Sequence, residues 1–198
     1  MDKETIGILS LLISVAHYAP YLHAISKGTA KPHAFSRLIW GITASVAFLG
    51  QLADGGGPGA WATGVIALAS FLIAALSYNG CRKCRQIRRS DWIALSVALS
   101  AIPLWLVTRD PLWSVALVTF VNIVGYAPTF RKSWSLPHEE MIYAFLVGCL
   151  KAVVSLWALD HYSVVTMIYP LSFCICDAVL VAMLLWRRKQ LSFSPALS

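Results

Sequence analysis

Charged residues are scarce in this chain of 198 residues, making up 13% of it, where a typical soluble domain has roughly one quarter. Hydrophobic residues reach 58%. A soluble fold of this size has no place for so much apolar surface, so lipid must solvate a large part of it. The shortage of charge therefore excludes an ordinary soluble domain and predicts an integral membrane protein.

Signatures of catalysis and of nucleotide binding are also missing. The sequence contains no Ser-His-Asp, paired-carboxylate or HExxH arrangement. The glycine-rich loop Asp54–Gly59 lacks the Lys-Ser/Thr of a phosphate loop and is typical of a flexible turn. Asp160 and His161 are expected in an outer loop without partners. We therefore predict neither an enzyme nor a protein with a cofactor.

What the chain does have is a series of apolar segments close to the length of about 20 residues that a helix needs to cross the hydrocarbon core. The segments are continuous rather than alternating, which excludes the strands of a membrane barrel. We predict an all-α membrane protein with seven transmembrane helices, the fourth being the shortest. The segments are Thr5–Ile25, Phe35–Leu52, Trp61–Tyr78, Trp92–Val107, Leu112–Phe130, Met141–Leu159 and Val164–Trp186.

Basic residues gather on one side of these segments. Of the 16 Lys and Arg, only Lys3 and Arg109 lie on the opposite side, and Lys151 lies within the sixth segment. Cytoplasmic loops are rich in Lys and Arg, so we expect the N-terminus outside and the C-terminus in the cytoplasm, in a bacterial inner membrane. This distribution explains the net charge of +7 without nucleic acid as a partner. The lipid bilayer is the expected partner, and the sequence leaves open whether the chain forms a homo-oligomer.

Two short strings occur twice in the same order. Tyr18-Ala19-Pro20 and Pro32-His33 flank the loop after the first segment, and Tyr126-Ala127-Pro128 and Pro137-His138 flank the loop after the fifth. Both copies lie on the expected cytoplasmic side, so the repeats are parallel and need one helix between them. We predict a first three-helix repeat over 1–78, a basic loop and linker helix over 79–111, a second repeat over 112–186 and a cytoplasmic tail over 187–198.

On these strings and this plan the chain resembles the SWEET sugar transporters and the wider PQ-loop superfamily. Pro20 and Pro128 are similar to the prolines near the cytoplasmic end of the first helix of each repeat, and Lys27–Trp40 resembles the basic loop and the opening of the second helix. The Pro-Gln dipeptide is absent, so a sugar as solute is not implied. The related KDEL-receptor-like proteins share the plan but bind peptides. From the residues alone, Pro20 and Pro128 either hinge their helices as a gate or simply stop them.

Three polar residues interrupt the last three segments at similar depth. The helical rise of 1.5 Å per residue places Asn122, Lys151 and Asp177 about 12, 15 and 13.5 Å from the cytoplasmic end. A charge at bilayer depth is costly and usually faces a cavity or a partner. We predict that Lys151 and Asp177 face one another or one shared aqueous cavity. A structural ion pair without a role in transport is the alternative.

Tyr143 and Tyr169 each precede one of these charges by eight residues, and either hydrogen-bond the solute or pack. The leading hypothesis is a carrier that moves a small polar solute by alternating access, with proton coupling left open. A ligand-binding receptor or assembly factor on the same scaffold is the alternative. Cys81 and Cys84 form a C-x-x-C motif that is open to palmitoylation, to zinc binding with two histidines, or to neither, and we predict no metal site.

Overall fold

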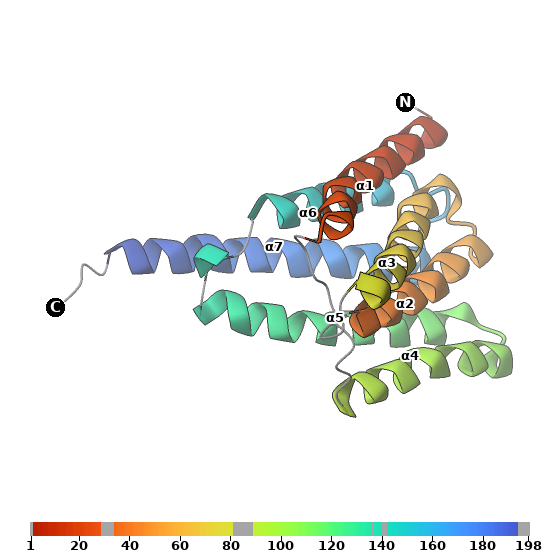
Figure 1. Cartoon of the computed structure of the whole chain (residues 1–198). Coiled ribbons are helices and arrows are strands. Elements are labelled where there is room, and N and C mark those ends of the chain that lie inside the picture. The colour runs from red at the N-terminus through yellow and green to blue at the C-terminus, as the bar shows by residue number, and fades with distance from the viewer. Residues whose placement is uncertain (1, 29–33, 81–88, 136, 140–141, 194–198) are drawn as a thin grey trace.

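Seven α-helices make up the computed structural model, which describes residues 2–28, 34–80, 89–135, 137–139 and 142–193 (Figure 1). Each predicted segment coincides with one helix, and these described ranges contain no strand, so the all-α prediction is confirmed. The helices are α1 (Lys3–Ser26), α2 (Ala34–Ala53), α3 (Trp61–Gly80), α4 (Arg89–Thr108), α5 (Pro111–Ser135), α6 (Ile142–Trp157) and α7 (Val164–Phe193), and short 3₁₀ helices η1 (Gly57–Ala60) and η3 (Pro137–Glu139) precede α3 and α6.

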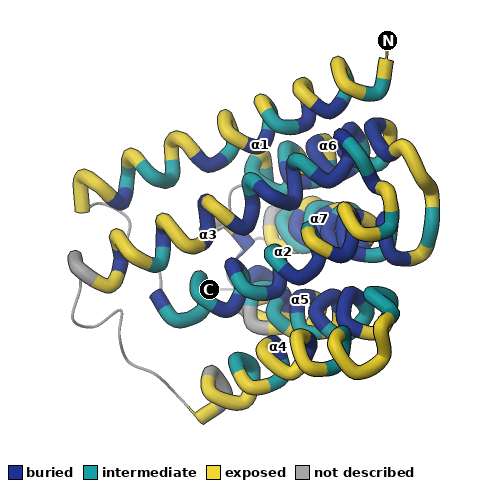
Figure 2. The backbone as a smooth tube through the Cα atoms, turned by 90° about the vertical axis from the view of Figure 1, so that its right-hand side faces the viewer, coloured by how far each residue is buried: buried dark blue, intermediate teal, exposed yellow. Residues whose placement is uncertain are grey.

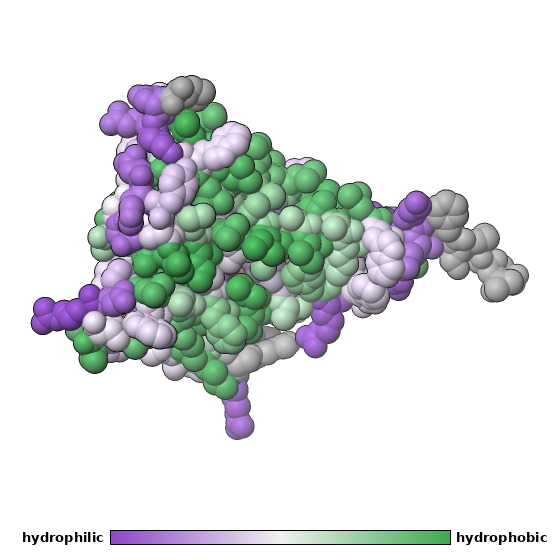
Figure 3. All heavy atoms as spheres, turned by 180° about the vertical axis from the view of Figure 1, so that it is seen from behind, coloured by the Kyte–Doolittle hydropathy of each residue, from purple (hydrophilic) through white to green (hydrophobic). Residues whose placement is uncertain are grey.

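The helices form a multi-pass membrane protein. Five of them, α1, α2, α3, α5 and α7, are long and apolar enough to cross a bilayer, whereas the apolar parts of α4 and α6 are shorter. Large apolar side chains point outward, among them Leu68, Leu106 and Val107, which are 72%, 71% and 82% exposed. Figure 3 shows apolar side chains across the middle of one face and hydrophilic ones toward its ends. Water would solvate such a surface poorly, and lipid solvates it well.

Contacts join helices within the groups α1–α3 and α5–α7 and also between these two groups. Helix α3 packs against both α1 and α2, and α7 packs against both α5 and α6. Helix α1 also contacts α6, and α2 contacts α5, while α4 lies against α5 and α2. In Figure 2, α1 and α4 form opposite edges of the bundle, and the two chain ends in Figure 1 lie at opposite ends of it.

Small residues allow these helices to approach closely. A Cβ added to Gly50 of α2 would lie 2.4 Å from Cγ2 of Val115 in α5, and one added to Gly41 would lie 2.8 Å from the Phe71 ring in α3. Between helices that lie in lipid, van der Waals packing is the main attraction, so close backbone approach stabilises the contact. The two glycines therefore fix how α2 sits between its neighbours.

The prolines do not end their helices. Helix α1 continues through Pro20 to Ser26, and α5 continues through Pro128 to Ser135. The alternative in which these prolines only stop the helices is therefore wrong, and the hinge stays a prediction. Helix α7 likewise passes Pro170 and runs on to Phe193, into the stretch expected to be a tail.

Candidate functional site

Lys151 places an ammonium group inside the bundle. The residue lies in α6 and is 4% exposed. Its Nζ lies 4.9 Å from the centroid of the Tyr18 ring on α1 and 6.0 Å from that of the Phe173 ring on α7. Within the described ranges it has neither an ion-pair partner nor a hydrogen-bond acceptor. Ring faces offset only part of the cost of removing a cation from water.

Asp177 is equally buried, but it has a hydrogen-bond partner. It lies in α7 and is 4% exposed. The Tyr126 hydroxyl of α5 donates to its Oδ1 at 2.9 Å. Its Oδ2 packs against Gly148 of α6, where an added Cβ would lie 2.2 Å from that oxygen. Tyrosine therefore orients the carboxylate, and glycine makes room for it.

No salt bridge joins Lys151 to Asp177 in the described structure, although a structural ion pair was the alternative to a shared site. The Asp177 carboxylate lies level with Gly148, about one helical turn before Lys151 on α6, because it turns toward Tyr126. The Phe173 ring lies 6.0 Å from the Tyr126 ring and within reach of Lys151. The opposite charges are thus neighbours in the bundle, but each is held by its own aromatic partner.

Two other predicted residues share this interior and one does not. Asn122 is 1% exposed, and its amide donates to the Ser172 hydroxyl at 3.5 Å, while Tyr169 packs edge-on against Phe173 with centroids 5.3 Å apart. Tyr143 is 65% exposed on the outside of α6. Eight residues are about 2.2 helical turns, which puts Tyr143 about 80° around the helix from Lys151. We therefore leave Tyr143 out of the site.

A cavity of about 10 Å³ lies beside Lys151. It has room for about one water molecule. The lining includes Thr63 and Ile66 of α3, Ser155 of α6, and Tyr169 and Phe173 of α7, but not Asp177. This cavity is therefore not one that the two charges share.

Tyr18 and Tyr126 are the site residues that sequence reasoning missed. Both belong to the repeated Tyr-Ala-Pro string, of which only the prolines had been given a role. The face of the Tyr18 ring contacts the Lys151 ammonium, and the Tyr126 hydroxyl donates a hydrogen bond to Asp177. The repeat itself was the signal that could have found them, because equivalent positions of a repeat point to equivalent places in the bundle.

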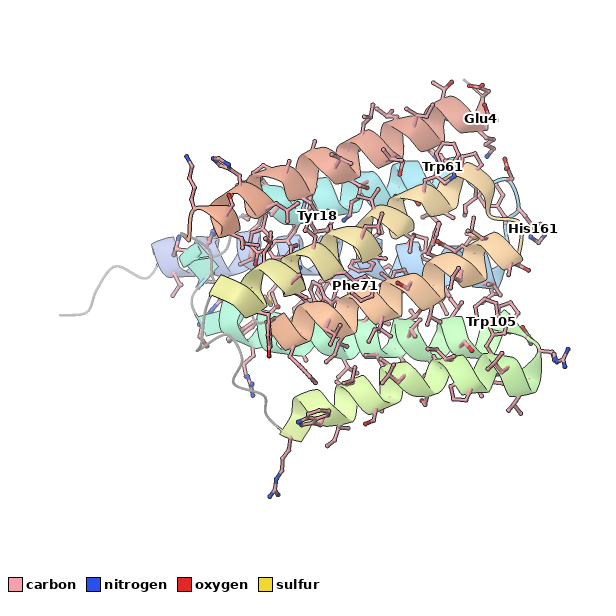
Figure 4. All side chains as sticks on the ribbon, turned by 45° about the vertical axis from the view of Figure 1, so that its right-hand side comes forward. Glu4, Tyr18, Trp61, Phe71, Trp105 and His161 are labelled. Carbon is pink, nitrogen blue, oxygen red and sulfur yellow. The ribbon has the colours of Figure 1, made fainter. Side chains whose placement is uncertain are left out.

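Hydrogen bonds join the α2–α3 loop to the α6–α7 loop, at the end of the bundle where Figure 4 shows His161 with Glu4, Trp61 and Trp105. His161 Nδ1 lies 3.0 Å from the backbone oxygen of Asp54, whose carboxylate accepts a hydrogen bond from Ser163. The Asp160 N–H donates to the Gly56 oxygen at 3.4 Å. The expectation that Asp160 and His161 lack partners is wrong. We call Asp54, Gly56, Asp160, His161 and Ser163 the loop latch.

Buried polar side chains continue these contacts below the loop latch. Gln51 of α2 donates to the Thr166 oxygen of α7 at 2.8 Å, and Ser155 of α6 donates to the Gly59 oxygen at 2.7 Å. Near the same end Lys3 donates to the Trp157 oxygen at 2.7 Å. These bonds hold the helices α1–α3 and α5–α7 together at this end.

Metal binding receives no support from the part of the chain that the structure describes, which contains no group of three or more His, Cys, Asp or Glu side chains able to hold an ion. Cys81 and Cys84 lie outside the described residues. Comparison of the chain with protein-family models, with curated proteins and with solved structures finds no match. The function is therefore inferred from the geometry of the buried site.

Proposed function

We propose that the protein is a membrane carrier that moves a small polar solute by alternating access around Lys151, Asp177, Asn122 and the aromatic residues beside them. The observation that carries this proposal is a pair of opposite charges buried on neighbouring helices without a salt bridge between them. A buried charge costs several kcal/mol unless it is well paired, so a purely structural pair is expected to close on itself. Charges kept apart at this depth are available to a ligand.

The packing order supports the two parallel repeats and the seven crossings. When α1, α2 and α3 are exchanged for α5, α6 and α7, every contact described above within and between the two groups has a counterpart. Helix α3 packs against α1 and α2, just as α7 packs against α5 and α6. Helix α1 contacts α6, just as α5 contacts α2. An axis along the membrane normal relates repeats in this way in several transporters. Helix α4 is then the linker, with the N-terminus outside and the C-terminus in the cytoplasm.

The loop latch supports alternating access. In this topology it joins two loops at the external end, where we expect it to act as the external gate. Its few exposed or half-buried hydrogen bonds are the kind of contact that opens at modest cost. Pro20 and Pro128 each remove a backbone hydrogen bond inside a helix, one in each repeat, and so provide matched hinges for rocking one repeat against the other.

A ligand-binding receptor on the same scaffold is the second candidate, favoured by the small size of the cavity. The repeated strings also resemble those of the SWEET and PQ-loop proteins. This resemblance agrees with a carrier, but it does not identify a sugar as the solute. Asp177 is the residue through which a proton would be coupled to transport, since it is the buried acid of the site.

Uptake and counterflow in reconstituted liposomes separate the two candidates. A carrier exchanges labelled solute against unlabelled solute, whereas a receptor binds it without flux. We expect Lys151→Met and Asp177→Asn to abolish flux and the exposed Tyr143→Phe to leave it unchanged. Flux that survives in the double variant Lys151→Met with Asp177→Asn would show that the two charges are only structural.

A further inference from the structure

Lys151 and Asp177 differ in the partners that they already have. Asp177 accepts a hydrogen bond from Tyr126, whereas Lys151 contacts the ring faces of Tyr18 and Phe173. Its ammonium interacts electrostatically with Asp177, but no hydrogen bond or salt bridge to Lys151 is formed within the part of the chain that the structure describes. An ammonium group has three donors and no acceptor of its own. What Lys151 lacks among the described residues is therefore a hydrogen-bond acceptor, and not a donor.

We propose that the transported solute is a small organic acid with a single carboxylate, which Lys151 binds directly. The inference rests on the carrier function proposed above and names its substrate class. A carboxylate supplies the missing acceptors and charge, and its bond to an ammonium is about twice as strong as a neutral hydrogen bond. Lys151 is a single cation and can pair directly with one carboxylate. A second negative charge, as in a dicarboxylate or a phosphate, would meet the nearby carboxylate of Asp177 and be repelled.

The surroundings of Lys151 suit an acid with an apolar body. The cavity beside it is bordered by Ile66 of α3 and by the rings of Tyr169 and Phe173. The Tyr18 ring covers the ammonium at 4.9 Å, in the place where a carboxylate would approach. Binding must therefore move Tyr18 and α1 away from α6. Tyr18 lies two residues before Pro20, so this movement falls at the proposed hinge and links solute binding to gating.

The test is a charge series measured by calorimetry on the full chain in lipid nanodiscs. Acetate, butanoate and benzoate are each compared with their amides, and butylamine, succinate and inorganic phosphate complete the set. We expect at least one monocarboxylate to bind about tenfold or more tightly than its amide, because the amide cannot form a charge-assisted bond. Equal or tighter binding of the amides, the amine, succinate or phosphate overturns the proposal. So does the absence of binding by all three carboxylates.

Two variants assign the preference to Lys151. Lys151→Met should reduce the carboxylate-to-amide affinity ratio to about one, and Lys151→Arg should keep most of it because the cation remains. Tyr143→Phe, at an exposed position on the outside of α6, should leave the ratio unchanged. If Lys151→Met does not fold, the Lys151→Arg protein and the wild-type series still decide. If Lys151→Met leaves the carboxylate-to-amide affinity ratio intact, the assignment of the preference to Lys151 is overturned.

Flux measurements separate this inference from the carrier proposal. The same acids and amides are followed into proteoliposomes, with protein-free vesicles as the control for leakage of the uncharged acid. A carboxylate preference in binding without any protein-dependent flux refutes the carrier and keeps the role of Lys151. Protein-dependent flux of an amide at the rate of its acid keeps the carrier and overturns the carboxylate specificity.

Discussion

Tyr126→Phe and Tyr18→Phe are the same chemical change at equivalent positions of the repeated string, yet the structure predicts different outcomes. Tyr126→Phe removes the donor 2.9 Å from Asp177 Oδ1 and keeps the ring packed against Phe130 and Phe173. Tyr18→Phe keeps the ring beneath the Lys151 ammonium, and the described structure shows no hydrogen bond from the Tyr18 hydroxyl. The pair therefore isolates one buried hydrogen bond.

The size of the effect follows from the burial of Asp177. Hydrogen bonds to charged groups contribute about 1.5–3 kcal/mol. Polar pairs between helices in a membrane average about 0.6 and reach about 1.7 kcal/mol, since the unfolded reference state in lipid also finds partners. Asp177 is only 4% exposed, so bulk water has little access to replace the lost donor. We therefore expect a value near the overlap of these two ranges. We predict that Tyr126→Phe lowers the free energy of unfolding by about 1.5 kcal/mol, and Tyr18→Phe by about 0.5 kcal/mol or less.

Unfolding of the purified protein in mixed micelles, titrated with a denaturing detergent, measures both variants against wild type. Repeating the titration in an Asp177→Asn background gives a double-mutant cycle for the Tyr126 bond. Equal destabilisation by the two tyrosine variants, or a Tyr126→Phe effect that is unchanged by Asp177→Asn, would refute the assignment of the hydrogen bond.

Three other perturbations test separate parts of the structure. Gly148→Ala should lower the free energy of unfolding by about 1–3 kcal/mol, because the added methyl group overpacks the buried Asp177 carboxylate. Gly125→Ala is the control and should be tolerated, because its Cβ would approach nothing closer than 3.4 Å. Equal unfolding curves for the two variants would contradict this. A disulfide between the two cysteines introduced by Asp54→Cys and Ser163→Cys should lock the loop latch and stop flux until reductant is added, and undiminished flux after complete cross-linking would show that the latch is no gate. A reporter fused after Ser198 should read cytoplasmic, while the thiol introduced by Asp54→Cys alone should react with an impermeant external reagent. If both positions report the same side, the number of crossings is not seven.

Much of the fold was determined by the sequence alone. The positions of all seven helices follow from runs of apolar residues, because a helix in lipid must satisfy its own backbone and cover it with apolar side chains. The same reasoning found Lys151, Asp177 and Asn122, since polar groups in such a run stand out and must be buried against protein. Both signals are local, so they can be read without knowing which helices are neighbours.

Only the tertiary structure decided which side chains meet. Tyr143 and Tyr169 have the same spacing from a charge, but Tyr143 faces outward from α6, and Tyr169 is enclosed because α7 packs against α2, α5 and α6. Asp177 turns to Tyr126 and not to Lys151, on the side where Gly148 leaves space for the carboxylate. The rotation of each helix about its axis, and its depth relative to its neighbours, come from packing between segments far apart in the chain, which hydropathy along one helix does not encode.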